Sequence, residues 1–151
     1  MSMNLVNNDS ERMMSVKKSI WHAEVRDYEL DSQGIVNNAN FLHYFEHARH
    51  VALSKDLGIN FIAYQKQGID LLMSEMCIKY HASLYSEDCF RVETAFAIQG
   101  RLRIIATQQI AIGDKLIATA KITIVCMDRV KGKPVMPSEV FNVMTSKLDV
   151  T

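Results

Sequence analysis

The chain has 151 residues, of which 48% are hydrophobic and 23% charged, and its 17 basic side chains balance 17 acidic ones. This length fits one domain with its own core, and the zero net charge argues against a nucleic-acid partner, which usually requires a basic excess. The three cysteines, Cys77, Cys89 and Cys126, show no CxxC spacing, which argues against a disulfide framework or a structural zinc site and favours a reducing compartment.

The two ends of the chain carry the weakest patterns. Residues 1–19 lack helix or strand periodicity, and we expect a disordered N-terminal tail ahead of a domain at 20–140. They also lack the apolar core of a signal peptide, and no segment approaches the ~20 apolar residues of a membrane span. A cytoplasmic protein without a membrane span is therefore expected. Residues 141–151 are assigned to a C-terminal tail.

A strand and then a helix are predicted in the first part of the domain. Apolar and polar side chains alternate over 21–28, which is typical of a strand. After a segment rich in turn residues, apolar side chains recur at helical spacing over 41–52. Asn37 or Asn38 can cap the start of this helix, and Gly58 is suited to end it.

Four strands joined by short turns are predicted downstream of Gly68, where the apolar period changes from 3.6 to 2. They are expected at 69–81, 89–98, 101–112 and 115–127. One helix cannot cover both faces of such a sheet, so we predict an α+β domain in which an antiparallel sheet of about five strands wraps around one long central helix. Several strands are apolar on both faces, which predicts an oligomer.

The helix contains a motif that is typical of metal sites. Residues 43–47 match the H-x-x-E-H pattern of one class of zinc protease, in which two histidines bind the metal and the glutamate acts as general base. No second ligand motif follows, and the chain is too short to build a protease substrate chamber, so we predict no metal site. The histidines, with His50, are expected on the exposed or subunit-facing side of the helix. Glu46 would then pair with Arg49 or His50.

Asp31 is the stronger candidate for chemistry. It stands seven residues before Asn38, with Gly34 between them to let the loop bend back. The first N–H groups of a helix have no intrahelical partner and can stabilise negative charge on an acyl carbonyl oxygen. A nearby carboxylate can attack that carbonyl or activate a water molecule against it. The alternative is that Asp31 only bonds the backbone of its own turn.

The pattern D-x-x-G-[IV]-V followed by N-N-x-x-[FY]-x-x-[YF]-[FY]-E-x-A-R occupies residues 31–49. It resembles the hotdog-fold acyl-CoA thioesterases, in particular the 4-hydroxybenzoyl-CoA thioesterase family and its relatives associated with the Tol-Pal system. The resemblance covers 25–137 and includes the Lys-Tyr-His-Ala stretch at 79–82. It implies a hotdog fold, a homodimer or homotetramer with a continuous double sheet, and hydrolysis of an acyl-CoA or acyl-carrier-protein thioester without a metal or redox cofactor.

The resemblance also implies roles for single residues. Asp31 matches the family's catalytic aspartate, a general base or nucleophile, and the backbone N–H near Asn38 matches the donor that polarises the thioester carbonyl. Glu46 matches a helix acid that is catalytic in a second subfamily, so it is the reserve candidate. Several Tol-Pal-type relatives have His or Tyr where this chain has Asn37 and Asn38, which leaves the acyl preference open.

Basic residues near turns are candidates for holding the phosphates of CoA, which is part of the substrate. Arg101 and Arg103 fall near positions that some relatives use, and Lys131 and Lys133 are further candidates. The alternative is that all four are solvated turn charges. Two rival functions remain: a hotdog-fold dehydratase or hydratase, which needs a catalytic histidine that the loop around Asp31 lacks, and a non-catalytic module that binds an acyl group.

Overall fold

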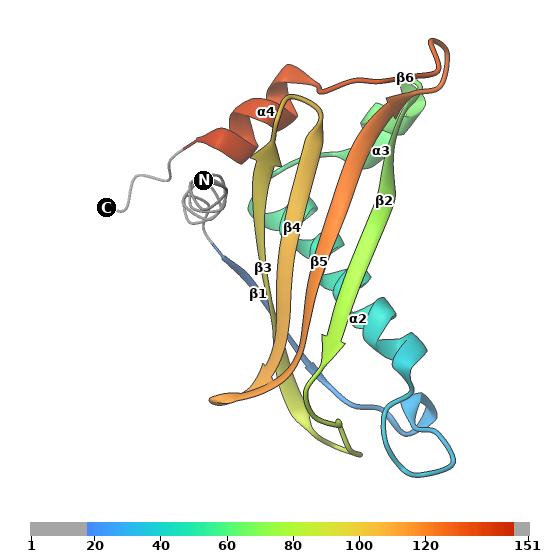
Figure 1. Ribbon diagram of the computed structural model, residues 1–151, viewed down its shortest axis with the longest axis vertical. Helices are drawn as coiled ribbons and strands as arrows, with labels where there is room; N and C mark the ends of the chain where they lie inside the picture. Colours follow the sequence, from blue (N-terminus) through green and yellow to red (C-terminus); the bar gives the residue numbers. More distant parts are fainter. Residues whose placement is uncertain (1–17, 147–151) are drawn as a thin grey trace, which may run out of the picture.

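The computed structural model describes residues 18–146 as one antiparallel sheet that curves around a helix (Figure 1). The strand order is β1-β3-β4-β5-β2, and β6 pairs with β5. The strands are β1 (Ser19–Glu24), β2 (Ile69–Tyr80), β3 (Cys89–Gln99), β4 (Arg103–Ile112), β5 (Lys115–Asp128) and β6 (Lys133–Pro134). The predicted α+β arrangement is confirmed. The N-terminal tail expected at 1–19 lies outside the described residues except for its last two positions.

The central helix α2 (Asn38–Val51) begins where the sequence predicts. Asn37 is its N-cap, and the side chain of Asn37 accepts the N–H of Ala39 at 2.8 Å. The helix continues into a π-helical turn, η2 (Ala52–Asp56), and Gly58 follows at φ 67°, a conformation that a Cβ atom disfavours. A short helix, α3 (Phe61–Lys66), follows.

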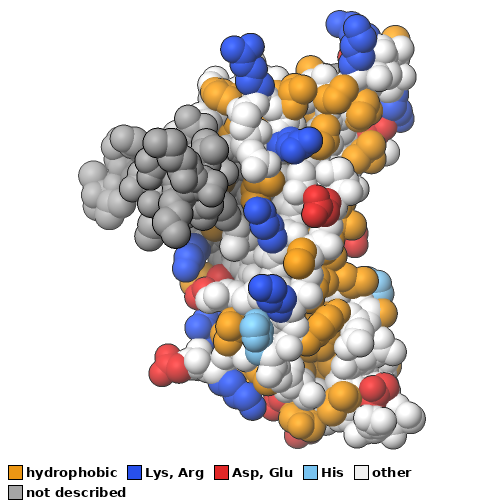
Figure 2. All heavy atoms as spheres, in the orientation of Figure 1, with side chains coloured by type: hydrophobic (Ala, Val, Ile, Leu, Met, Phe, Trp, Pro, Cys, Tyr) orange, Lys and Arg blue, Asp and Glu red, His pale blue; other side chains and the backbone are white. Residues whose placement is uncertain are grey.

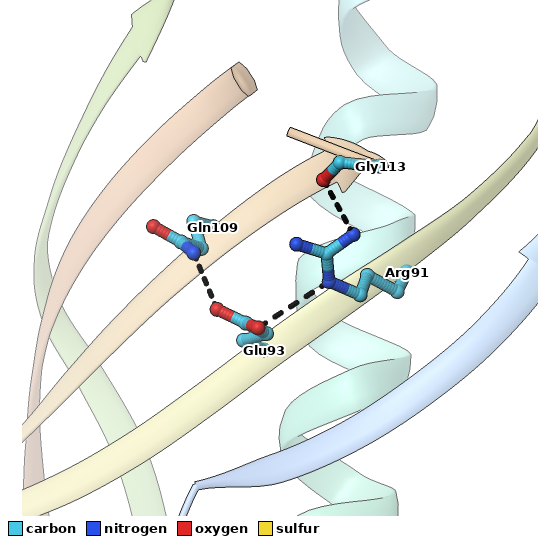
Figure 3. Close-up of polar contacts among 4 residues, drawn as sticks. All are labelled: Arg91, Glu93, Gln109 and Gly113. Carbon is cyan, nitrogen blue, oxygen red and sulfur yellow. Dashed lines mark hydrogen bonds and ion pairs between the residues drawn. The ribbon is translucent and has the colours of Figure 1, made fainter. Parts of the chain in front are cut away.

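The core lies between α2 and the concave face of the sheet. Among its fully buried side chains are Phe45, Leu53, Val92, Ile110, Ile117 and Ile122. The other face of the sheet carries polar side chains on the middle of β3 and β4. There the Arg91 guanidinium lies between Glu93, with Nε 3.3 Å from Oε1, and the carbonyl oxygen of Gly113, which accepts from Nη1 at 2.8 Å (Figure 3). Gln109 donates to the second oxygen of Glu93.

Four parts of the fold differ from the sequence prediction. The first strand ends at Glu24, because 27–29 form the 3-10 turn η1 (Asp27–Glu29), in which the Glu29 carboxylate accepts the N–H of Arg26 at 2.8 Å. Arg101 lies in the hairpin turn and not in a strand, since Gln99 pairs directly with Arg103. Strand β6 has only two residues, which is too short for a periodic pattern.

The fourth difference is the helix α4 (Ser138–Thr145), which includes part of the expected C-terminal tail. Val140 and Met144 stand one turn apart, and both are buried in the core. The apolar residues of α4, Val140, Phe141, Val143 and Met144, span only a little more than one turn, a run too short to identify a helix by periodicity. Residues 141–145 therefore belong to the packed domain.

Arg49 occupies an unexpected position. Of the two partners predicted for Glu46, the structure shows His50 and not Arg49, because the Arg49 side chain is buried and Nη1 donates to Oε1 of Gln108 at 3.0 Å. Gln108 in turn donates to the carbonyl of Phe45 at 3.0 Å and to the hydroxyl of Thr94 at 2.9 Å. Burial lowers the pKa of Arg49. A polar network thus joins α2 to β3 and β4 inside the core.

Replacing Gln108 by leucine should destabilise the fold strongly. Gln108→Leu removes the acceptor of a buried guanidinium, and we expect the free energy of unfolding to fall by about 2–4 kcal/mol. Adding Arg49→Met removes the stranded charge, so the double variant should recover more than half of that loss. Urea denaturation of the two single variants and the double variant measures both effects. Simple additivity of the single losses would contradict this account.

Candidate active site

Asp31 begins a tight turn whose geometry restrains its carboxylate. The N–H of Asp31 donates to the carbonyl of Ile35 at 2.8 Å, which closes the turn, and Gly34 inside it has φ 78°. One carboxylate oxygen, Oδ1, accepts the N–H groups of Gln33 at 2.8 Å and of Ile35 at 3.4 Å. Within residues 18–146, no hydrogen bond to Oδ2 is present. Asp31 therefore does bond its own turn, and one of its oxygens stays available for a reacting group.

The same loop is fastened to the start of α2. The carbonyl of Glu29 accepts the N–H of Asn37 at 3.1 Å and the side-chain amide of Asn40 at 2.8 Å. The N–H of Asn38, at the first helical position, has no partner in the part of the chain that the structure describes. Asp31 and the unpaired N–H of Asn38 thus stand at the two ends of one short loop, residues 31–38. Glu29 and Asn40 were not predicted, because no motif marks a contact between residues eleven positions apart.

Tyr44 approaches this loop from inside the core. Its hydroxyl is buried near Glu29 and makes no hydrogen bond of good geometry with any described residue. Burial is the main cause that raises the pKa of Tyr44, and Glu29 raises it further. The phenol therefore stays neutral, and it adds no charge to the loop beside Asp31.

Glu46 does not lie beside Asp31 within one chain. It stands eight residues after Asn38, which is about 12 Å along a helix. Its Oε1 is 4.0 Å from Nε2 of the exposed His50, as the second half of the pairing prediction expected. His47 is exposed, and its ring contacts Trp21 at 4.7 Å between centroids. No group of three or more His, Cys, Asp or Glu side chains in residues 18–146 is close enough to share a metal ion.

The basic candidates lie at the opposite end of the sheet from Asp31 (Figure 1). Arg103 begins β4 and is in register with Val125, which pairs with Leu72 near the start of β2. The other end of β2 lies at the helix start, where Tyr80 contacts Phe41 at 5.3 Å between ring centroids. Arg101 and Lys131 occupy turns at the Arg103 end. Figure 2 shows Lys and Arg side chains spread over the open face and not gathered in one patch.

An apolar pocket of about 760 Å³ lies at the same far end. The end of the central helix, α3 and the start of β2 surround it, and its lining includes Ile59, Phe61, Ile62, Ile69, Leu71 and Leu72. His50 also lines it and stands twelve residues after Asn38, so the pocket is about 18 Å from the helix start. One chain therefore keeps Asp31 and this pocket apart.

Strand β2 is a free edge of the sheet in the described chain. It is twelve residues long, and the side chains of Leu72, Met73 and Tyr80 on it are about half exposed. A long, unprotected, apolar edge is a site at which another strand pairs. It runs past both the pocket and the helix start.

Comparison with known proteins gives a consistent picture. A family model described as the thioesterase-like superfamily matches residues 25–143. The acyl-acyl carrier protein thioesterase ATL3 of Arabidopsis thaliana is 40% identical over 81 residues, which are 54% of this chain and 42% of that protein. The acyl-CoA thioester hydrolase YbgC of Escherichia coli is 24% identical over 115 residues, covering 76% and 85% of the two chains.

Among solved structures, Slr0204 of Synechocystis, a 1,4-dihydroxy-2-naphthoyl-CoA thioesterase, superposes with a TM-score of 0.81. The superposition covers 89% of this chain and all of that one at 19% identity, which confirms the predicted hotdog fold. The chain spans less than half the length of the ATL3 relative. No helix in residues 18–146 is long and apolar enough to cross a membrane.

Proposed function

Because the chain belongs to the thioesterase-like superfamily, we propose that it hydrolyses an acyl thioester of CoA or of an acyl carrier protein to a free acid and a thiol. The observation that carries this proposal is the free oxygen of Asp31 on a loop that is hydrogen-bonded to the start of α2, where the N–H of Asn38 is unpaired. The matched relatives named as thioesterases support the same reaction class.

In this reaction Asp31 acts as general base or as nucleophile. As a base, it takes a proton from water while the water oxygen bonds to the acyl carbon, and the helix-start N–H groups stabilise the negative carbonyl oxygen. The C–S bond then breaks, and the departing thiolate takes up a proton. One donor of an oxyanion hole is typically worth about 2.7–4 kcal/mol of transition-state stabilisation. Because the donor at Asn38 is backbone, substituting its side chain does not remove it.

We propose that two copies pair through their β2 edges around a twofold axis, as a homodimer that can pair further into a tetramer. The axis reverses the direction of α2, so the pocket end of one copy lies beside the Asp31 loop of the other. In this arrangement the Asp31 loop of one copy meets the pocket of the other, although the loop and the pocket of a single chain lie far apart. It also places Glu46, the reserve candidate, on the helix side that faces the pairing edge. Gel filtration with light scattering tests the assembly, and a monomer at working concentration would contradict it.

The partner's basic turns are then positioned to hold the phosphates of CoA. We expect the double variant Arg101→Ala, Arg103→Ala, and separately Lys131→Ala, to raise KM for an acyl-CoA several-fold with kcat nearly unchanged, since these groups bind the nucleotide equally in the ground and transition states. The control is the matching acyl-pantetheine, which lacks the nucleotide and should be hydrolysed equally by wild type and variants. Equal losses on both substrates would assign these residues another role.

The direct test of the proposed function is a panel of acyl-CoA and acyl-carrier-protein thioesters. Turnover is followed by loss of the thioester absorbance, because the exposed Cys77 and Cys89 would react with a thiol reagent. Hydrolysis of at least one thioester well above the buffer rate supports the proposal. Binding without turnover would indicate an acyl-binding module, and hydration of an enoyl-CoA would indicate a hydratase.

A further inference from the structure

The pocket at the far end of α2 differs from the Asp31 loop in being lined mainly by apolar side chains. Three polar side chains on its wall are already engaged by the protein. The Ser54 hydroxyl donates to the carbonyl of His50 at 2.7 Å, the Asn60 side chain accepts the N–H of Ala63 at 3.1 Å, and Asp70 pairs with Arg129 at 3.2 Å.

The remaining polar side chains of the lining belong to His50 and Gln65. His50 faces Glu46, and the Gln65 side chain is exposed on α3. Most of the residues that line the pocket are therefore aliphatic, with one aromatic ring among them. A ligand segment with several hydroxyl groups would meet few partners on this wall, which is unfavourable in an apolar site.

We infer that this pocket binds the unbranched alkyl chain of a fatty acyl thioester, whose carbonyl is presented to Asp31 of the second copy. This inference rests on the proposed function and specifies its substrate class. It sets this chain apart from the Slr0204 structure, whose named acyl group is a dihydroxylated naphthalene ring. An alkyl chain needs no polar partner and gains from every methylene that leaves water.

Helix α3 forms one wall of the pocket, and at Ile62 it can be altered without disturbing the core. None of its residues is buried, and Ile62, which lines the pocket, is 66% exposed. Ile62→Asp therefore introduces a charge into the apolar wall while leaving the fold intact. Leu116→Asp is the matched control, since Leu116 is a part-exposed leucine on the open side of β5 and lies in neither proposed site.

The first experiment measures kcat/KM for saturated acyl-CoA substrates from butyryl to dodecanoyl. For wild type we expect about a fourfold rise per added methylene, the factor that corresponds to ~0.8 kcal/mol, until the pocket is filled. Ile62→Asp should lower the value for dodecanoyl-CoA at least tenfold and that for butyryl-CoA less than twofold. Leu71→Trp, which fills the pocket from β2, should act in the same direction, and Leu116→Asp should match wild type.

The second experiment measures binding of dodecanoate, which has no thioester, by calorimetry to wild type and to Ile62→Asp. Wild type should bind it, and the variant should bind it at least tenfold more weakly. If no thioester is hydrolysed but this difference holds, the proposed function fails and the alkyl pocket stands. If thioesters are hydrolysed with no dependence on chain length, or a hydroxylated aromatic acyl-CoA is preferred, the alkyl inference is overturned and the proposed function stands.

Discussion

Asp31→Asn should lower kcat/KM for a good acyl thioester by about 10²–10⁴-fold while the protein stays folded. The magnitude is that of a lost general base. Asparagine keeps an oxygen that can accept the N–H groups of Gln33 and Ile35, so the turn that now depends on Oδ1 is preserved. The variant loses only the basicity and nucleophilicity of the free oxygen. The effect should fall mainly on kcat, since the carboxylate acts on the reacting atoms and not on the nucleotide.

A matched control separates chemistry from a loss of charge. Asp114 lies in the exposed hairpin turn between β4 and β5 and belongs to neither proposed site, so Asp114→Asn should hydrolyse the substrate like wild type. Thermal unfolding of both variants establishes that neither has lost its fold. If Asp31→Asn keeps the wild-type rate, Asp31 is a turn residue only. Glu46→Gln then becomes the next variant to assay.

Two inactive variants should restore activity when they share one dimer. In the proposed arrangement each site takes Asp31 from one copy and the pocket from the other. A dimer of Asp31→Asn with Leu71→Trp thus has one site carrying both changes and one site carrying neither. Random pairing of equal amounts makes half of the dimers mixed, so about a quarter of the wild-type activity on dodecanoyl-CoA should return.

Co-expression with two different tags yields the mixed dimer, and sequential affinity steps purify it. The control is Asp31→Asn paired with a differently tagged copy of itself, which should stay inactive. A purified mixed dimer without activity would place the base and the pocket of each working site in the same chain. That outcome would refute the twofold arrangement but would leave Asp31 as the base.

The sequence predicts the long elements well, because their patterns repeat many times. Strands β3, β4 and β5 lie within two residues of their predicted bounds, and Asn37 caps α2 as one of the two asparagines proposed. The features that the sequence does not predict depend on packing between residues that are far apart in the chain. The α4 helix has two core contacts in a single turn, and the position of Arg49 depends on Gln108, which is 59 residues away.

In the candidate site, too, local features could be predicted from the sequence and long-range ones could not. The Asp31 turn and the helix start are neighbours in the chain, so their association could be predicted. The basic candidates could not be placed relative to Asp31, since their position depends on the direction and register of β2, β4 and β5. The pocket was also missed, because it is formed by three elements whose apolar residues show the same pattern as ordinary core residues.

Helix α3 has a consequence for how such proteins diverge. It contributes no buried side chain, and Gly58 and Gly68, both at positive φ, connect it to the core elements on either side. Its Phe61 and Tyr64 pack against the core, whereas exposed positions such as Ile62 carry no such constraint. Substitutions at the exposed positions therefore cost little stability. In the proposed arrangement, substrate range can drift by mutation at these positions while the Asp31 turn, which several backbone hydrogen bonds fix, stays unchanged.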